Sequence, residues 1–158
     1  FGLADRLHIA QKEARDLIEG YYQQFPKIIT YLNDTIAFAR DHGYVETLLH
    51  RRRYIRDINA ANGMLRKAAE RNAINAPIQG TAADLIKIAM IQVDREMSRR
   101  HLKSKMLLQI HDELVFEVPH GEIEMMKELV TNIMNNAITM EVPLATDVNY
   151  GSSWFDAH

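Results

Sequence analysis

The residues best suited to chemistry are the charged triplet His111, Asp112 and Glu113, which interrupts two apolar, β-prone runs within residues 106–118. Such runs predict two strands joined by a hairpin turn at the triplet. Asp is common in turns because its side chain bonds to nearby backbone, so the triplet needs no ligand. Asp112 and Glu113 could equally hold Mg²⁺, which takes one or two carboxylates and leaves its other positions to water and phosphates. The two interpretations are compatible.

A second polar set, Arg71, Asn75 and Gln79, recurs every four positions in a segment that predicts a long helix. Such a row of donors suits the minor groove of DNA, where every correct base pair offers acceptors at nearly equivalent positions. An exposed polar stripe on a surface helix is the alternative interpretation. Pro77 lacks a backbone donor and predicts that this helix is interrupted or kinked.

Positive charge gathers in residues 51–71, although the formal net charge of the chain is −2. Three consecutive arginines, Arg51, Arg52 and Arg53, stand in a predicted hairpin. Arginine offers phosphate oxygens a planar fork of donors, so this run suits a nucleic-acid backbone. A solvated charged face is the other interpretation.

The elements that must position these residues follow from the spacing of apolar side chains. An apolar stretch at residues 85–93 is expected to be buried, and the charged stretch 94–105 is expected to face solvent. The pattern predicts an α+β chain with helices over residues 11–25, 26–42, 64–100 and 122–137, and strands over residues 44–48, 53–55, 106–110, 114–118 and 144–150.

Length and composition indicate one ordinary globular domain, since 158 residues are 47% hydrophobic and 25% charged. The absence of cysteine excludes disulfides and thiolate metal sites. The sequence shows no stretch of about 18 apolar residues and no signal pattern, which predicts a cytoplasmic protein without a membrane span. The abrupt start at Phe1, without an initiator Met, leads us to expect a part of a longer protein.

Two stretches, from Ala69 to Asp84 and from Leu108 to Glu117, closely resemble the C-terminal part of the family A DNA polymerases of the bacterial DNA polymerase I type. The resemblance extends from residues 1–4 through residues 43–48 and the arginine run to residues 154–158. It therefore covers essentially the whole chain.

This resemblance implies a partial right-hand polymerase fold, with antiparallel palm strands and an acidic hairpin packed against long helices. Residues 1–43 would form part of the fingers, and residues 44–158 the palm-associated helices and hairpin. The implied activity is template-directed transfer of a nucleotide from dNTP to a primer 3′ hydroxyl by two Mg²⁺ ions, in DNA replication and repair. The expected location is the bacterial cytoplasm, at the nucleoid.

The resemblance also implies roles for individual residues. Asp112 would be a catalytic metal ligand, supported by Glu113, and His111 would lie close to the primer end. The polar row would line the minor groove of the primer–template near the new base pair. The arginine run would lie near the duplex backbone. In this numbering, the row is Arg71, Asn75 and Gln79, and the run is Arg51, Arg52 and Arg53.

Two departures and two absences qualify the resemblance. His50 stands where relatives usually have Gly, and Arg56 stands where they commonly have Pro, which affects the turn and the phosphate contacts of the first hairpin. The family's second catalytic Asp and its nucleotide-holding fingers helix are both missing. We therefore expect the isolated chain to be inactive, to hold metal weakly or not at all, and to self-associate through exposed palm surface.

Two other functions remain open at this point. A palm fragment of a single-subunit RNA polymerase would carry a similar acidic hairpin, but Glu113 and the run from Ala76 to Asp84 favour the DNA enzyme. A non-catalytic module that binds duplex DNA would explain the charge cluster and the missing motifs.

Overall fold

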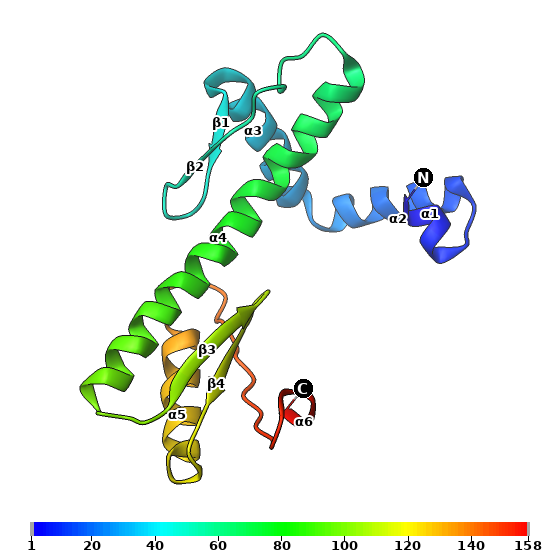
Figure 1. The fold of residues 1–158 in the computed structure, drawn as a ribbon. Helices are drawn as coiled ribbons and strands as arrows, with labels where there is room; N and C mark the ends of the chain where they lie inside the picture. Colours follow the sequence, from blue (N-terminus) through cyan, green and yellow to red (C-terminus); the bar gives the residue numbers. More distant parts are fainter. Residues whose placement is uncertain (1, 158) are drawn as a thin grey trace. The chain divides into compact units, whose positions relative to one another are not determined.

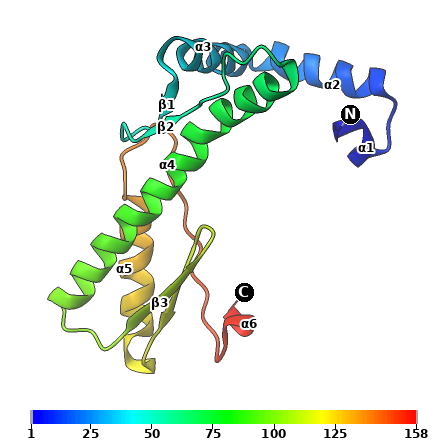
Figure 2. The same cartoon turned by 45° about the horizontal axis from the view of Figure 1, so that its top comes forward.

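The computed structural model describes residues 2–157, so Phe1 and His158, which the resemblance also covered, lie outside the described residues. The chain divides into two compact units, residues 1–78 and 79–158. Each unit combines helices with a two-stranded antiparallel sheet, which confirms the predicted α+β class (Figures 1 and 2). The long helix α4 contributes residues to both units.

The first unit begins with three helices that are separated by short breaks. The helices predicted over residues 11–25 and 26–42 are confirmed, whereas α1 was not predicted because it is short and has little to cap it. Gly43 ends α3 with a left-handed backbone (φ 78°), and its N–H donates to the carbonyl of Ala39 at 2.8 Å. The elements are α1 (Gly2–Leu7), α2 (Gln11–Gln24), α3 (Pro26–His42), β1 (Tyr44–Glu46), β2 (Arg52–Tyr54) and the start of α4 (Gly63–Arg99).

The core of the first unit is built from small and β-branched side chains. Ala39 of α3 and Ala73 of α4 have no exposed surface. Both alanines belong to one cluster with the buried hairpin residue Val45, and their small side chains leave room for it. The buried residues of this core are Ala39, Val45, Ile55, Ile58, Ala69 and Ala73.

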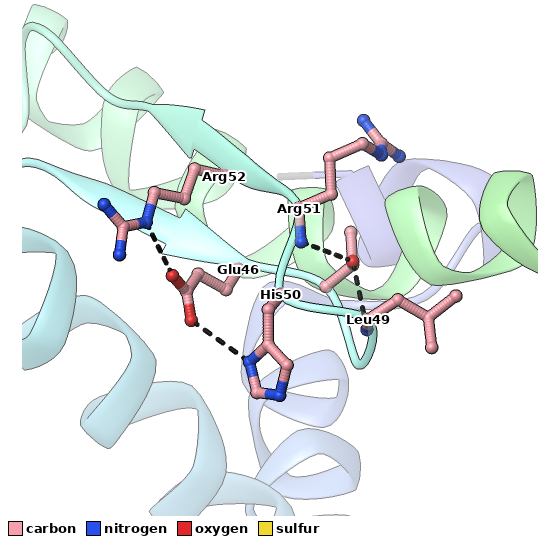
Figure 3. Close-up of polar contacts among 6 residues, drawn as sticks. Glu46, Leu49, His50, Arg51 and Arg52 are labelled. Atoms are coloured by element: carbon pink, nitrogen blue, oxygen red, sulfur yellow. Dashed lines mark hydrogen bonds and ion pairs between the residues drawn. The ribbon is translucent and has the colours of Figure 1, made fainter.

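The hairpin of the first unit has a tight, internally bonded turn. The buried Thr47 hydroxyl accepts hydrogen bonds from the N–H groups of Leu49 (3.3 Å) and Arg51 (3.2 Å) (Figure 3). His50 adopts a left-handed backbone (φ 60°), a conformation that glycine adopts at least cost. The return strand begins at Arg52, opposite Glu46, one residue earlier than predicted.

The second unit contains the predicted acidic hairpin. Ile110 pairs with Glu113, which leaves His111 and Asp112 as a two-residue turn. The predicted position of the hairpin turn is therefore confirmed. The helix predicted over residues 122–137 is also confirmed, with a short 3₁₀ turn before it. The elements are the end of α4, β3 (Lys105–Ile110), β4 (Glu113–Glu117), η1 (His120–Glu122), α5 (Ile123–Asn135) and α6 (Trp154–Ala157).

The core of the second unit lies between α4, α5 and one face of the acidic hairpin. Only one side of α4 reaches it: Ala89 and Val93 are buried, whereas Ile91 is 50% exposed. The expectation that residues 85–93 would be buried throughout is therefore wrong, since a helix presents only one stripe to a neighbour. The buried residues are Val93, Met97, Met126, Leu129 and Val130, with Met106, Phe116, Val118 and Val148 packed against them.

Two further expectations need correction. Pro77 does not interrupt α4, which is helical from Gly63 to Arg99, whereas a kink at the proline stays a prediction. Residues 144–150 form no strand within the described chain, although their burial alternates as predicted. Leu144, Thr146 and Val148 are half-buried between exposed neighbours, so the pattern indicated one-sided burial rather than sheet pairing.

Glu122 ties the segment before β3 to the segment before α5. Its carboxylate accepts hydrogen bonds from the Ser104 hydroxyl (2.6 Å), the Ser104 N–H (2.9 Å) and the Lys103 N–H (2.9 Å). These donors lower the pKa of Glu122, the Ser104 hydroxyl most of all, because they stabilise the ionised form. The contact fixes where β3 starts.

No helix within residues 2–157 has the length and the apolar content that a membrane crossing requires.

The left-handed backbone at residue 50 predicts that glycine is tolerated there better than a β-branched residue. His50→Gly should preserve the free energy of unfolding, whereas His50→Val should lower it by about 1–2 kcal/mol, because a β-branched residue is strained at positive φ. Urea denaturation of the three proteins would measure this. Equal stability of the Gly and Val variants would contradict the left-handed assignment.

The Glu122 contact predicts a specific pH dependence. A carboxylate whose pKa is lowered by folding stabilises the protein above its unfolded pKa, and this contribution is lost as pH falls through the folded pKa. Glu122→Gln should therefore be less stable than the wild type near pH 7, and the difference should shrink below about pH 4. Thermal denaturation from neutral to acid pH would test this.

Glu124→Gln is the matched control, because the Glu124 side chain is 84% exposed. Its one ion pair, with Lys127, is long at 3.8 Å. It should leave the pH profile of the wild type unchanged. A Glu122→Gln deficit that persists undiminished at low pH would point to lost packing instead of lost charge.

Candidate functional site

The acidic tip of the β3–β4 hairpin is held by strand pairing and by one side-chain contact. The amide of Gln109 donates to the backbone carbonyl of His111 at 2.8 Å and closes the turn. His111 itself has a left-handed backbone (φ 52°), which histidine adopts more readily than most residues. The position of Asp112 is therefore set by its neighbours in the hairpin.

The two carboxylates point away from the core of their unit. Phe116 packs against the core, and successive residues of a strand point to opposite faces, so Glu113 belongs to the other face. Asp112 is exposed in the turn, and Glu113 is half-buried. The tip thus presents carboxylate oxygens where a cation and a phosphate could approach.

The donor chemistry of this tip suits Mg²⁺, which binds through one or two carboxylates and keeps other positions for substrate. Within residues 2–157, however, no group of three or more His, Cys, Asp or Glu side chains is arranged to hold a metal ion. Asp112 and Glu113 are by themselves an incomplete set of ligands.

The predicted polar row on α4 is exposed along its whole length. Arg71, Asn75 and Gln79 are all exposed, whereas Ala69 and Ala73 of the same helix are buried. In the described part of the chain the three side chains make no hydrogen bond or ion pair, which leaves their donors for a ligand. The helix brings these three residues together.

All three arginines of the arginine hairpin β1–β2 are exposed, and one of them, Arg52, is held by an ion pair and an aromatic ring. The guanidinium of Arg52 donates to Glu46 at 2.8 Å (Figure 3). The same group lies 4.5 Å from the ring centre of Tyr44. This ion pair lowers the pKa of Glu46 and raises that of Arg52. Arg51 and Arg53 are exposed as well, so the hairpin carries three arginines on its surface.

One group of residues escaped the sequence analysis. Phe38 and His42 of α3 stack on each other, and Tyr44 and Tyr54 of the arginine hairpin continue this group of rings. The sequence contains a pattern that could have indicated this group. Two ring-bearing residues stand one helical turn apart, and tyrosines follow at paired positions of the two strands.

Comparisons with known proteins agree with this description. DNA polymerase I of Lactococcus lactis subsp. lactis (strain IL1403) is 51% identical over 157 residues, covering 99% of this chain and 18% of that protein. DNA polymerase I of Streptococcus pneumoniae serotype 4 is 50% identical with the same coverage. That of Geobacillus stearothermophilus is 47% identical, also with the same coverage. The chain thus spans 18% of the length of these curated relatives.

A solved structure is similar as well. The POL domain of Pol1 from M. smegmatis, in complex with DNA primer-template and dNTP, matches with a TM-score of 0.95 and 47% identity, covering 99% of this chain and 28% of that chain. The family model described as DNA polymerase family A matches residues 1–156. The chain, with its acidic hairpin and its exposed polar row, therefore belongs to DNA polymerase family A.

Proposed function

We propose that the protein containing this chain carries out template-directed DNA synthesis, joining a nucleotide from dNTP to a primer 3′ hydroxyl. The observation that carries the proposal is the acidic turn of the β3–β4 hairpin, which displays Asp112 and Glu113 on a fixed support. Family membership supports it, as does the similar M. smegmatis domain, which is described with primer-template and dNTP. Because the relatives are bacterial, we propose that the protein acts in the cytoplasm, at the nucleoid.

Asp112 would hold a divalent metal ion, which we propose is Mg²⁺, and Glu113 would support the same acidic site. When bound, such ions stabilise the charge that develops on the transferred phosphoryl group. The tip supplies two carboxylates only, so the remaining ligands must come from other parts of the protein, from water and from the substrate. The isolated chain would therefore be inactive.

The other predicted residues would position the DNA. Arg71, Asn75 and Gln79 carry donors on an exposed helix surface, which suits the acceptors that all base pairs share in the minor groove. His111, next to Asp112 in the turn, would lie close to the primer end. The exposed arginines of the run Arg51–Arg53 would contact phosphates of the duplex backbone.

We assign residues 1–43 to the fingers and residues 44–158 to the palm on the basis of the family resemblance. Large apolar side chains such as Leu107 (53% exposed) and Ile78 (59% exposed) would be covered by the rest of the polymerase, and in the isolated chain they favour self-association.

Removal of the Asp112 carboxylate should separate catalysis from binding. In the complete polymerase, Asp112→Ala should lower nucleotide incorporation by at least about 100-fold, since metal ions contribute several kcal/mol to the transition state. Affinity for primer-template should change by less than about threefold, because phosphate contacts dominate it. Single-turnover primer extension and a DNA-binding titration would measure the two effects.

Glu117→Ala is the matched control, since this carboxylate lies on the same strand away from the tip and is 64% exposed beside Lys105. It should leave incorporation near the wild-type rate. The 158-residue chain alone, assayed in parallel, should give no extension. Incorporation by Asp112→Ala at a normal rate would refute the metal role.

The polar row should affect all base pairs alike. Arg71→Ala and Gln79→Ala should each weaken extension from a correctly paired primer end by about tenfold, because a hydrogen bond involving a charged or buried partner contributes about 1–3 kcal/mol. The loss should be equal for the four terminal base pairs. Asn72→Ala, at an exposed neighbouring position, should leave extension at the wild-type rate. A new base preference in either variant would argue against minor-groove contact.

A further inference from the structure

The last turns of α4 lie beside α5 in the second unit (Figures 1 and 2). Residues of both helices line a pocket of about 360 Å³, which we call the arginine pocket because Arg95, Arg99 and Arg100 form one of its walls. We propose that the arginine pocket binds a free nucleoside polyphosphate, with the phosphates on the guanidinium groups and the base on the apolar wall opposite.

The arginine pocket lies at the other end of the β3–β4 hairpin from the acidic tip. Leu129, which lines the pocket, belongs to the core on which Met106 and Phe116 pack. Those two residues pair with each other near the open end of the hairpin, whereas Asp112 stands in the turn at the closed end. Nucleotide binding in the pocket would therefore be separate from the DNA synthesis proposed above.

Glu96 holds two of the arginines side by side. Its Oε1 atom accepts hydrogen bonds from Nη2 of Arg99 and from Nε of Arg100, both at 2.7 Å. Its Oε2 atom accepts a further bond from Nε of Arg99 at 2.8 Å. These bonds lower the pKa of Glu96 to about 2, those from Arg99 most of all, because they stabilise the ionised form. The two guanidinium groups are thus fixed around one carboxylate.

Both fixed guanidinium groups keep donors for a ligand. Each has five N–H donors, and the bonds to Glu96 use two nitrogens of Arg99 and one of Arg100. The two side chains are 70% and 40% exposed. Arg95, one turn earlier on the same face of α4, is exposed and makes no hydrogen bond or ion pair within residues 2–157. Three guanidinium groups against one carboxylate leave a surplus of positive charge.

The wall formed by α5 is mostly apolar. Leu129 is 4% exposed, and Ile133, one turn later on the same face, is half-buried. Asn132 lies between them in the sequence, and its side-chain oxygen accepts a hydrogen bond from Asn136 at 3.1 Å. That bond leaves the NH₂ group of Asn132 for a polar atom of a ligand. An apolar surface with a few polar groups is typical of small-molecule sites.

The two walls together identify the class of ligand. Guanidinium groups bind phosphate oxygens through a planar fork of donors, and two groups fixed around one point suit a centre with several oxygens. Inorganic phosphate would leave the apolar wall uncovered, and an apolar molecule would leave the guanidinium groups without an anion. A nucleoside polyphosphate satisfies both walls. The volume of about 360 Å³ also lies in the range of small-molecule sites.

Photo-crosslinking of 8-azido-ATP to the complete polymerase, followed by mass spectrometry of the labelled peptides, tests the proposal. EDTA removes metal-dependent nucleotide binding at the acidic tip. The label should appear in peptides that contain residues 92–100 or 129–133. ATP should protect these peptides at concentrations at least about tenfold lower than adenosine, which lacks phosphate, and at least about fivefold lower than inorganic triphosphate, which lacks the base.

Single substitutions then assign the contacts. At a limiting probe concentration, Arg99→Gln and Arg100→Gln should each lower the labelling of these peptides by at least about fivefold, because each removes charge-assisted hydrogen bonds. Lys87→Gln is the matched control, since it removes one positive charge from an exposed position of the same helix that does not line the pocket. It should be labelled like the wild type. All three variants should extend primers at the wild-type rate, which shows that they are folded.

Labelling confined to other peptides would overturn the proposal. Equal protection by ATP and adenosine, or better protection by an acidic peptide than by ATP, would overturn it too, because the ligand would then not be a nucleotide. An equal loss of labelling in Arg100→Gln and Lys87→Gln would mean attraction by overall charge instead of binding in the pocket. Primer extension by Asp112→Ala is measured separately, so a failure of nucleotide binding here and a failure of the proposed DNA synthesis are distinguishable.

Discussion

The structure depends on the helix α4, which contributes buried residues to the core of each unit. Ala69 and Ala73 are buried in the first core, and Val93 and Met97 are buried in the second. Arg71 and Asn75 each stand two positions after a buried alanine, about 200° around the helix, so they face away from the first core. Their exposure is the consequence. Pro77 lies inside α4 without ending it.

The same separation of roles recurs in the two hairpins. In each, one face or edge belongs to a core, and the turn is stabilised by a local hydrogen bond: Gln109 to the His111 carbonyl in one, and backbone N–H groups to Thr47 in the other. Both turns contain a histidine with a left-handed backbone, at His50 and His111. A hairpin anchored in this way can present charged groups to solvent without losing its register.

Electrostatics distinguish the two presented surfaces. The tip at Asp112 offers oxygen ligands, which suit a divalent cation that is shared with phosphates. The β1–β2 hairpin offers guanidinium groups beside aromatic rings, with Arg52 held by Glu46 and Tyr44. Guanidinium groups suit phosphate oxygens, so the two surfaces differ in the sign of the group that they can hold directly.

The sequence by itself determined the elements and the kinds of chemistry: the helices from residue 11 to 42, the acidic hairpin at Asp112 and the spacing of the polar row all follow from local patterns. Tertiary structure decided what local patterns do not encode. Residues 144–150 alternate in burial without pairing, and Ile91 is exposed within an apolar stretch, because partners far along the chain determine which side is covered. The Glu122 contact to Ser104 and the rings around Tyr44 likewise arise only when separate segments meet, since side-chain hydrogen bonds and ring contacts require proximity in space.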